Sequence, residues 1–472
     1  MDGSTIAAIA TPVGSGGIGI IRISGPDALS IAGSIFCRSA SSLASTVNST
    51  ENTDLVRLPS HRLYHGYIRD IEKRQVLDEV LLAVMKSPRS YTREDVVEIQ
   101  AHSGPIALGT ILDLVIKQGA RIAEPGEFTK RAYLNGRIDL TQAEAVADVI
   151  NARTKKSLEI ATAQITGDMR ACIESIRRAL LQVLTEIEAA IDFPDEMEEI
   201  GETGPAMQMI QRDVIASIEA LIDHYNTSHF LRDGLKIAVI GRPNVGKSSL
   251  MNRLIEKERV IVTAVPGTTR DLIEESLNIR GIPVILTDTA GLHETEDPVE
   301  TIGIEKTHAY VNGADLILFM LDVSCPISDT DNQIYETIKN KPVILVLNKS
   351  DLVADDYKVE LPAGWQELPC QSISALYNLG LTQLKELIAT VSLGETLLGT
   401  DQQIVPNLRH KRALEQSLQV SQAALKGLQL QTPTELVAIE IRAAINFLDD
   451  ILGLNTGEEV IDQIFSRFCI GK

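Results

Sequence analysis

The residues with the clearest chemistry lie in the sequence GRPNVGKSS, which begins at Gly241. Gly241 and Gly246 allow a loop whose successive backbone N–H groups point inward at α- and β-phosphate oxygens. Lys247 adds a positive charge near the β- and γ-phosphates, and the hydroxyl of Ser248 is a ligand for Mg²⁺. The spacing matches the complete phosphate-binding pattern, so we expect a nucleotide site here.

Two later segments supply groups for Mg²⁺ and the γ-phosphate. VPGTTRD contains Thr268 and Thr269, either of which completes the coordination of Mg²⁺. VILTDTAG is an apolar strand that ends at Asp288, which is placed to hold the Mg²⁺ shell, while Gly291 leaves a backbone N–H for the γ-phosphate. The ligand is therefore expected to be a nucleoside triphosphate bound with Mg²⁺.

The identity of the base is predicted from VILVLNKSD, an apolar strand followed by Asn348, Lys349 and Asp351. A carboxylate at Asp351 accepts hydrogen bonds from both N1–H and the exocyclic amine of guanine, a pair that adenine does not offer. Ser374 and Ala375 follow, with a backbone N–H suited to the guanine carbonyl. Each motif is weak alone, but in this order at the ends of apolar strands they indicate GTP.

The residue after DTAG is Leu292, where the Ras-type arrangement has a glutamine that orients the attacking water. A leucine side chain cannot do this. Either hydrolysis is very slow, or a polar group in the acidic stretch that follows replaces the glutamine; the candidates are Glu294, Glu296 and Glu300. Arg270 is a candidate arginine finger, although a solvated charge explains it equally well.

These motifs need strands and helices to position them. Ile237, Val239 and Ile240 form an apolar strand before the first loop, and SSLMNRLI begins a helix after it. The alternation predicts an α/β P-loop GTPase domain of the Ras-like kind over residues 234–391.

The first 118 residues alternate strand-like and helix-like runs. IGIIRIS, LYHGYI, EVLLAVM and DVVEIQ are predicted strands, and PDALSIAGSIF and PIALGTILDLVIKQG are predicted helices, which indicates an α+β domain. GSGGIG, from Gly14 to Gly19, matches the dinucleotide pattern GxGxxG. A β-branched run follows it where that pattern requires a helix, so we expect no Rossmann site.

Helical periodicity dominates the rest of the chain. It runs from about Thr141 to Ile191 without proline, and it resumes on both sides of the GTPase module, in residues 206–226, 407–430 and 432–454. We expect an all-α domain with the GTPase module inserted into it and its two halves packed together. The predicted division is 1–118 for the N-terminal domain, 119–233 and 392–472 for the two helical parts, and 234–391 for the GTPase.

The composition limits partners and location. The net charge of −20 argues against a chain that grips nucleic acid unaided, because phosphate contact requires clustered Lys and Arg. A partner could supply the basic surface, or a local patch of Arg409, His410, Lys411 and Arg412 could suffice. Five scattered cysteines, the lack of a signal sequence and the lack of 18 consecutive apolar residues predict a soluble cytoplasmic protein without a membrane partner.

The motifs GRPNVGKSS, PGTTRD, DTAGL and NKSD, with the C-terminal CIGK, closely resemble the MnmE (TrmE) family of bacterial and organellar GTPases that modify the tRNA wobble uridine. TPVGSGGIGIIRISG, YTREDVVEIQAHSG, PGEFTKRAYLNGRIDLTQAEAVADVI and AIDFPDE extend the resemblance to essentially the whole chain. The resemblance implies GTP hydrolysis and addition of an aminomethyl or carboxymethylaminomethyl group at C5 of that uridine. An FAD-dependent MnmG-type protein is the implied partner in a heterotetramer, with FAD on the partner only.

For GTP, the resemblance implies that K⁺ replaces an arginine finger when two GTPase modules meet across their nucleotides. Glu300 would orient the water, with Lys247 as the second catalytic residue, and Mg²⁺ would be held by Ser248 and Thr269. The implied K⁺ ligands are Asn244, Thr263, Val265 and Thr268. The predicted GTP-binding residues are Asn244, Val245, Gly246, Lys247, Ser248, Ser249, Thr263, Ala264, Val265, Pro266, Gly267, Thr268, Thr269, Asp288, Thr289, Ala290, Gly291, Asn348, Lys349, Asp351, Ser374 and Ala375.

The resemblance also implies that the N-terminal domain forms a homodimer and binds 5-formyltetrahydrofolate, or a related reduced folate, as one-carbon donor. The implied folate residues are Arg22, Glu98, Arg137 and Lys472. A carboxylate accepts hydrogen bonds from a pterin ring, and Arg or Lys holds the glutamate tail. From the residues alone, a structural ion pair at a strand end explains Arg22 and Glu98 better than a binding role, and it is the resemblance that reverses this.

Two questions stay open from the sequence. Cys469, in the apolar tail FSRFCIGK, invites interpretation as a nucleophile, but no base accompanies it, and a packed or docking residue explains it as well. The GTPase motifs by themselves also fit a regulatory switch GTPase that acts only as a binding scaffold, for example in ribosome assembly. The N-terminal domain with Arg22 and Glu98, and the CIGK tail, favour the modification enzyme.

Overall fold

The computed structural model describes residues 3–38 except 13 and 15, 53–192 except 71 and 74, 204–258, 275–288, 311–354 except 312, 359–397 and 404–472. These residues form two compact units, one of residues 3–147 with 452–472 and the other of residues 148–451. Within the described part of the chain, no helix is long and apolar enough to cross a membrane.

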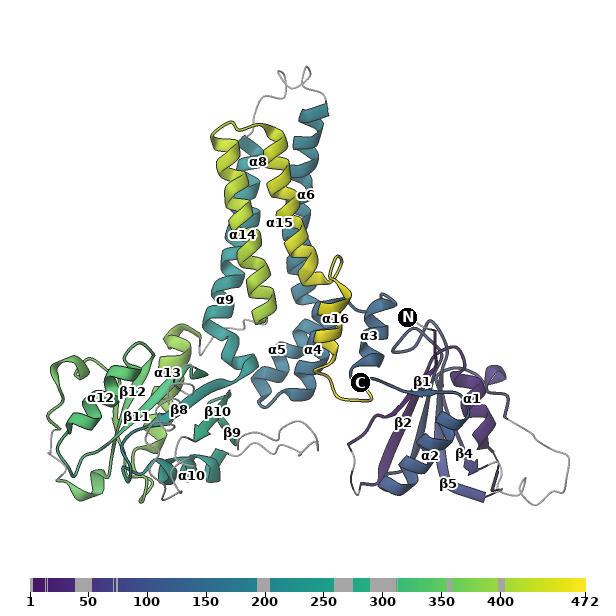
Figure 1. Ribbon diagram of the computed structural model, residues 1–472, viewed down its shortest axis with the longest axis horizontal. Helices are drawn as coiled ribbons and strands as arrows, with labels where there is room; N and C mark the ends of the chain where they lie inside the picture. The colour runs from purple at the N-terminus through teal and green to yellow at the C-terminus, as the bar shows by residue number, and fades with distance from the viewer. Residues whose placement is uncertain are drawn as a thin grey trace. The chain divides into compact units, whose positions relative to one another are not determined.

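A seven-stranded sheet in the order β3-β4-β5-β6-β2-β1-β7 forms the first unit (Figure 1). Neighbouring strands are antiparallel except β1 and β7, which are parallel. Alternate residues such as Ile21 and Ile23 are buried against helices α1 (Ala28–Ile35) and α2 (Pro105–Lys117). The strands are β1 (Ile6–Ile9), β2 (Ile18–Ser24), β3 (Phe36–Cys37), β4 (Arg62–Asp70), β5 (Gln75–Met85), β6 (Val96–His102) and β7 (Arg121–Ile122).

The predicted strands and helices of this unit are confirmed. Strand β2 begins at Ile18, directly after the glycine-rich turn, so the chain does not form the helix that a Rossmann site needs. Strand β1, with four residues, and strands β3 and β7, with two residues each, were not predicted, because segments this short carry no readable alternation.

Three further helices complete the first unit: α3 (Glu127–Leu134), the start of α4 (Leu140–Asn151) and α16 (Glu458–Phe465). Leu140, Ala143, Ile461, Phe465 and Phe468 form a buried cluster among them. The C-terminal residues thus pack in the same unit as the N-terminal sheet. The four-part division of the chain stays a prediction.

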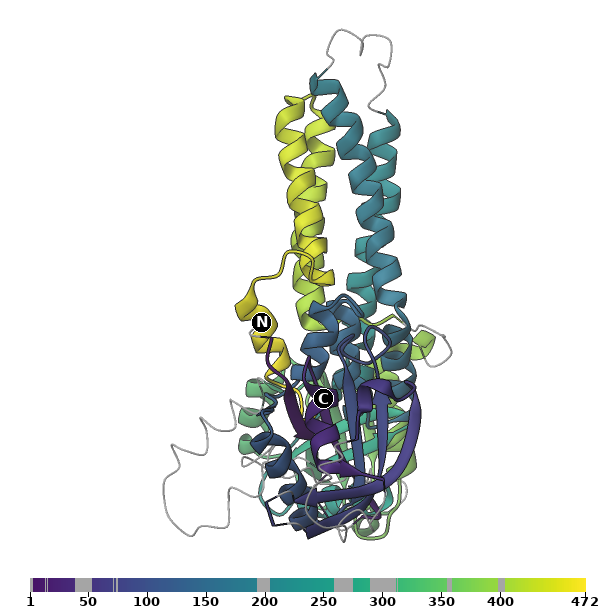
Figure 2. The same ribbon diagram turned by 90° about the vertical axis from the view of Figure 1, so that its right-hand side faces the viewer.

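Long helices from both sides of the GTPase module lie side by side in the second unit (Figures 1 and 2). Ion pairs of Arg177 with Asp449 and of Arg442 with Glu188 join α6 to α15. The two halves therefore form one bundle, which confirms the inserted topology. The helices are α5 (Lys155–Thr166), α6 (Asp168–Asp192), α8 (Gly204–Met209), the π-helical η4 (Ile210–Ile215), α9 (Ala216–Asp233), α14 (Leu408–Gln429) and α15 (Thr434–Leu452).

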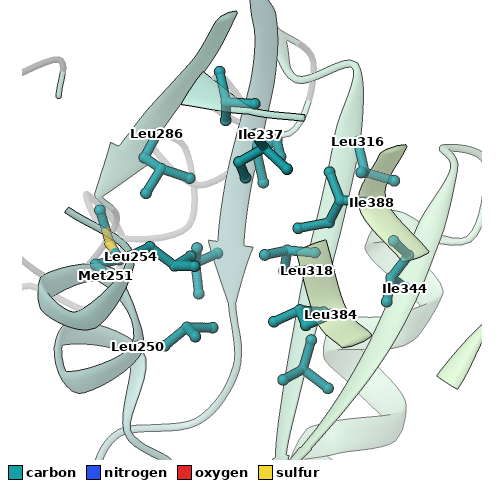
Figure 3. Close-up of a cluster of buried hydrophobic side chains, with 14 of the residues drawn as sticks. Ile237, Leu250, Met251, Leu254, Leu286, Leu316, Leu318, Ile344, Leu384 and Ile388 are labelled. Carbon is teal, nitrogen blue, oxygen red and sulfur yellow. The ribbon is translucent and has the colours of Figure 1, made fainter. Parts of the chain in front are cut away.

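The GTPase module has a six-stranded sheet in the order β13-β12-β11-β8-β10-β9, parallel except for β9. Leu250 and Leu254 of α10 and Leu384 and Ile388 of α13 pack on one face (Figure 3). Helix α12 lies with the buried Trp365 in the cluster on the other face. The strands are β8 (Leu235–Ile240), β9 (Glu275–Ile279), β10 (Ile282–Asp288), β11 (Leu316–Asp322), β12 (Val343–Asn348) and β13 (Cys370–Ser372), and the helices are α10 (Lys247–Glu258), α12 (Asp329–Ile338) and α13 (Leu381–Leu397).

Short 3₁₀ segments occur in both units. They are η2 (Leu55–Arg57) in the first unit, and η6 (Ser350–Leu352) and η7 (Ala363–Trp365) in the GTPase module.

Candidate functional site

The strand register brings the predicted GTP motifs to one edge of the second sheet. Asp288 at the end of β10 pairs with Val239 of β8, and Asn348 at the end of β12 pairs with Asp322 of β11. Because these strands are parallel, the loops that follow them lie at the same carboxyl edge, where open α/β sheets bind their ligands. The arrangement predicted from the motifs is therefore the one that the sheet produces.

The first loop runs from Gly241 to the start of α10. A Cβ atom would collide with the Met320 carbonyl oxygen at Gly241 and with the Asn348 side-chain amide at Gly246, where φ is +102°. Only glycine fits these two close approaches. The Nζ of Lys247 donates hydrogen bonds of 2.9 Å to the carbonyl oxygens of Gly241 and Arg242, so the ammonium group lies over the loop.

Asn348 connects three of the motifs. Its Nδ2 donates to the carbonyl oxygen of Val245 at 2.7 Å, and its Oδ1 accepts from the backbone N–H of Ala375 at 3.1 Å. The residue is only 3% exposed, so both bonds are shielded from water. This single side chain therefore fixes the phosphate loop and the two base loops against one another, while Asp351 on the same loop is exposed.

Lys349 lies beside Asp322 at the end of β11, with 2.5 Å between Nζ and Oδ2, and its backbone has a φ of +63°. Partial burial favours protonation of the Asp322 carboxyl, but hydrogen bonds from Lys349 and Ser324 outweigh it and hold the pKa of Asp322 below its usual value. The paired carboxylate positions the Lys349 side chain at the nucleotide edge.

Sequence reasoning missed Asp331, which is fully buried behind the phosphate loop. Its Oδ1 lies 2.8 Å from Nε of Arg242, and its Oδ2 accepts hydrogen bonds of 2.9 Å from the backbone N–H and hydroxyl of Ser328. The pair thus ties the loop to the capping box at the start of α12. The only signal in the sequence was the Ser-x-x-Asp spacing, which marks a helix start but does not name Arg242 as a partner.

A second candidate site lies in the first unit. Arg22 of β2 and Glu98 of β6 are cross-strand partners, and Nε of Arg22 donates to Oε1 of Glu98 at 2.9 Å. The structural ion pair is therefore real, yet each side chain keeps about a fifth of its surface exposed, at 20% and 18%. Nη1 of Arg22 also lies 3.4 Å from the carbonyl oxygen of Gly471, which places the C-terminal Lys472 next to this pair.

Tyr91 links this pair to Arg137. The guanidinium carbon of Arg22 lies 5.6 Å from the ring centroids of Tyr91 and Phe128, and that of Arg137 lies 4.6 Å from the Tyr91 ring. The four residues assigned to folate from the resemblance are thus brought together around one aromatic ring and the chain terminus. In the sequence Arg22 and Glu98 are 76 residues apart, and Lys472 lies at the far end of the chain.

The C-terminal tail is docked in the same unit. The carbonyl oxygen of Cys469 accepts a hydrogen bond of 3.3 Å from the backbone N–H of Gly126, and the Cys469 side chain is half-buried. A Cβ atom at Gly471 would lie 2.5 Å from the Ile9 carbonyl oxygen, so this position requires glycine. The tail contacts fit the docking interpretation of Cys469 and leave its chemistry open.

Comparison with known proteins gives matches along the whole chain. The family model described as "MnmE helical domain" matches residues 140–469, and that described as "GTP-binding protein TrmE N-terminus" matches residues 5–137. Proteins from Carboxydothermus hydrogenoformans and Desulforamulus reducens are 43% and 41% identical, each over 99% of both chains, and one from Oceanobacillus iheyensis is 39% identical over 100% of both. Each is named "tRNA modification GTPase MnmE".

This chain belongs to the MnmE family. The resemblance seen in the sequence is confirmed, as is the multidomain fold with an inserted Ras-like module.

The basic segment considered for RNA contact in this MnmE family member is not an open patch. His410 is fully buried and caps α14, and Arg409 donates to the carbonyl oxygens of Asp450 and Ile451 at 2.7 and 3.0 Å. The Nζ of Lys411 lies 4.9 Å from the Tyr225 ring centroid. Of the four basic residues only Arg412 is exposed, because Arg409 contacts α15, Lys411 contacts α9 and His410 lies in the capping box of α14.

Several predicted residues of the MnmE family site lie outside the described residues. They are Thr263, Ala264, Val265, Pro266, Gly267, Thr268, Thr269, Arg270, Thr289, Ala290, Gly291, Leu292, Glu294, Glu296 and Glu300. For Asp288 the structure describes the backbone at the end of β10.

Proposed function

We propose that this chain hydrolyses GTP and acts in tRNA modification, the activity that the name of its relatives states. The observation that carries the proposal is the Asn348 junction, which holds the phosphate loop at Val245 and the base loop at Ala375 in one buried unit. A guanine nucleotide bridges the same two loops, so a preformed junction presents both ends of its site together.

The chain's own residues take separate roles in binding GTP. Backbone N–H groups of the loop that ends in α10 receive the phosphates, Lys247 sits over that loop, and exposed Asp351 receives the guanine edge. Ser248, exposed in the first turn of α10, and Thr269 would hold Mg²⁺, which supplies charge neutralisation at the β- and γ-phosphates. Mg²⁺ prefers oxygen ligands such as the Ser248 hydroxyl and a carboxylate. Strand β10, whose last residue is Asp288, pairs with β8, the strand that leads into the phosphate loop.

The missing arginine finger is proposed to be replaced by K⁺. Asn244 is exposed in the phosphate loop with φ of +64°, and its amide oxygen suits a hard monovalent cation together with Thr263, Val265 and Thr268. Bound by these residues, K⁺ would supply the positive charge that an arginine finger supplies in other GTPases. Glu300 orients the attacking water in place of the absent glutamine.

The first unit is proposed to bind a reduced folate such as 5-formyltetrahydrofolate through Arg22, Glu98, Arg137 and Lys472. Support comes from their assembly around Tyr91 and the docked C-terminus. We further propose that this unit forms a homodimer in the cytoplasm and that an MnmG-type FAD protein supplies the redox chemistry and completes the basic surface for tRNA. The acidic charge of the chain supports the need for such a partner.

The test is restoration of the modified wobble uridine, measured by mass spectrometry of tRNA, in bacteria that lack their own family member. The wild-type chain is expected to restore it, and Lys247→Ala, which removes the ammonium over the loop, is expected not to. If the wild-type chain hydrolyses GTP in vitro but restores no modified uridine and instead co-purifies with ribosomal particles, the scaffold function replaces this proposal.

A further inference from the structure

An open cavity of about 470 Å³ lies on the surface of the first unit beside Tyr91, and its three arginines are exposed to solvent. Three arginines line it, Arg89, Arg93 and Arg137, together with His61, and no carboxylate is among the lining residues. In a chain with a net charge of −20, a cavity lined by charges of one sign attracts anions selectively.

Two of these arginines are held in place by backbone carbonyl groups. Nη1 of Arg137 donates to the carbonyl oxygen of Tyr91 at 3.0 Å, and Nη1 of Arg93 donates to that of Asn135 at 2.9 Å. Glu94, which follows Arg93 in the sequence, accepts hydrogen bonds from Arg131 and Ser24. Uncharged partners therefore orient two guanidinium groups whose charge is left for a ligand.

The backbone at this cavity is also unusual. His61 and Arg93 both have φ of +59°, a left-handed conformation that non-glycine residues seldom adopt. Backbone strain of this kind collects at sites that bind ligands, because the surrounding structure must hold it in place. Both residues line the cavity.

We propose that this cavity binds the oligo-γ-glutamate tail of a folate whose pterin end lies at Arg22 and Glu98, an inference that rests on the proposed folate function. The Tyr91 ring connects the two places, since Arg137 contacts it from the cavity and Arg22 lies 5.6 Å from its centroid. Each added γ-linked glutamate contributes one more α-carboxylate, and guanidinium groups bind carboxylates in bidentate geometry.

A single-stranded RNA is the alternative polyanion, and the cavity suits it less well. RNA-binding grooves combine positive charge with exposed aromatic rings on which bases stack. The one tyrosine ring here, Tyr91, is already covered by the guanidinium of Arg137.

The test compares binding of 5-formyltetrahydrofolate as monoglutamate and as pentaglutamate to the full-length protein by isothermal titration calorimetry. The pentaglutamate is expected to bind about tenfold more tightly, since each exposed ion pair is worth up to a few-fold in affinity. The double variant Arg89→Gln with Arg93→Gln removes two exposed side chains, so it should fold, keep the monoglutamate affinity within about twofold, and lose most of the pentaglutamate gain.

A matched control removes the same charge elsewhere in this unit. Lys73 and Lys117 are exposed and do not line the cavity, and Lys73 lies at the opposite end of β5 from Met85. The double variant Lys73→Gln with Lys117→Gln should retain the pentaglutamate gain.

The outcomes separate this inference from the function on which it rests. If neither folate binds, the proposed folate site fails and this inference fails with it. If the monoglutamate binds and the pentaglutamate is no tighter, or if the lysine control loses the gain equally, only the tail site is overturned. If a short single-stranded RNA binds and displaces the pentaglutamate, and the arginine variant abolishes RNA binding, the cavity is an RNA contact and the inference is wrong.

Discussion

Replacement of Asn348 by alanine should destabilise the GTPase module far more than its place in a nucleotide-binding loop motif suggests. The side chain donates to the Val245 carbonyl oxygen and accepts from the Ala375 N–H, and both bonds are buried. Alanine removes both bonds at once and puts no polar group in their place. The phosphate loop and the base loop then lose the two hydrogen bonds that join them through this side chain.

The magnitude follows from the groups left behind. A buried donor or acceptor that loses its partner costs roughly 1–3 kcal/mol, so two such groups lower the free energy of unfolding by about 2–6 kcal/mol. With a urea dependence of about 2 kcal/mol/M, the midpoint of unfolding should fall by about 1–3 M. Binding of GTP should weaken as well, because the loops are no longer held at the spacing of the nucleotide.

Urea unfolding followed by tryptophan fluorescence is a specific assay. The chain has a single tryptophan, Trp365, which is 3% exposed and packs against Phe319 and Tyr335 in the core of the GTPase module. Its emission therefore reports on this module and not on the helical bundle or the N-terminal sheet.

The matched control is Asp351→Ala on the same loop, whose exposed side chain should change the unfolding free energy by no more than about 0.5 kcal/mol while abolishing guanine recognition. If Asn348→Ala unfolds within about 0.3 M urea of the wild type, the junction does not stabilise the module and the reasoning is refuted.

Four further outcomes are expected. Asp351→Asn should shift preference from guanine toward xanthine in nucleotide competition, because an amide can donate to the xanthine 2-carbonyl; an unchanged preference for GTP would contradict this. Glu300→Ala should leave GTP affinity nearly intact and lower turnover at least ~10-fold, and turnover within twofold of wild type would rule out its water-orienting role. GTP turnover per protein molecule should be higher in KCl than in matched NaCl and should rise with protein concentration, because hydrolysis needs two modules. Equal turnover in the two salts would exclude a K⁺ site at Asn244. Burial favours protonation of Glu127, but hydrogen bonds from two arginines and a backbone N–H outweigh this effect and lower the pKa of Glu127. The carboxylate therefore contributes its full stabilisation above about pH 4.5, and this stabilisation is lost as the pH falls through the pKa of the folded state. Calorimetry should show Tm values of wild type and Glu127→Gln that are far apart at pH 7 and converge toward pH 3, and a difference in Tm that is independent of pH would contradict this.

The sequence by itself determined the GTPase module, because its chemistry is written in local spacing. A glycine loop needs only its own residues to curve, and Gly241 and Gly246 stand where a Cβ would collide with neighbours. Each motif follows an apolar strand, and parallel strands necessarily bring the motifs to one edge. The inserted helical topology was predictable for the same reason, since helical periodicity resumes after the module.

Tertiary structure alone decided which distant residues meet. Periodicity shows which face of an element is buried but not which partner covers it. Thus the pairing of Arg242 with Asp331, the packing of α16 in the N-terminal unit, and the use of Arg409 to hold α15 were not readable from the chain. The arginine cavity is of the same kind, because Arg89, Arg93 and Arg137 come together only when the chain folds around Tyr91, in a protein whose overall charge is strongly negative.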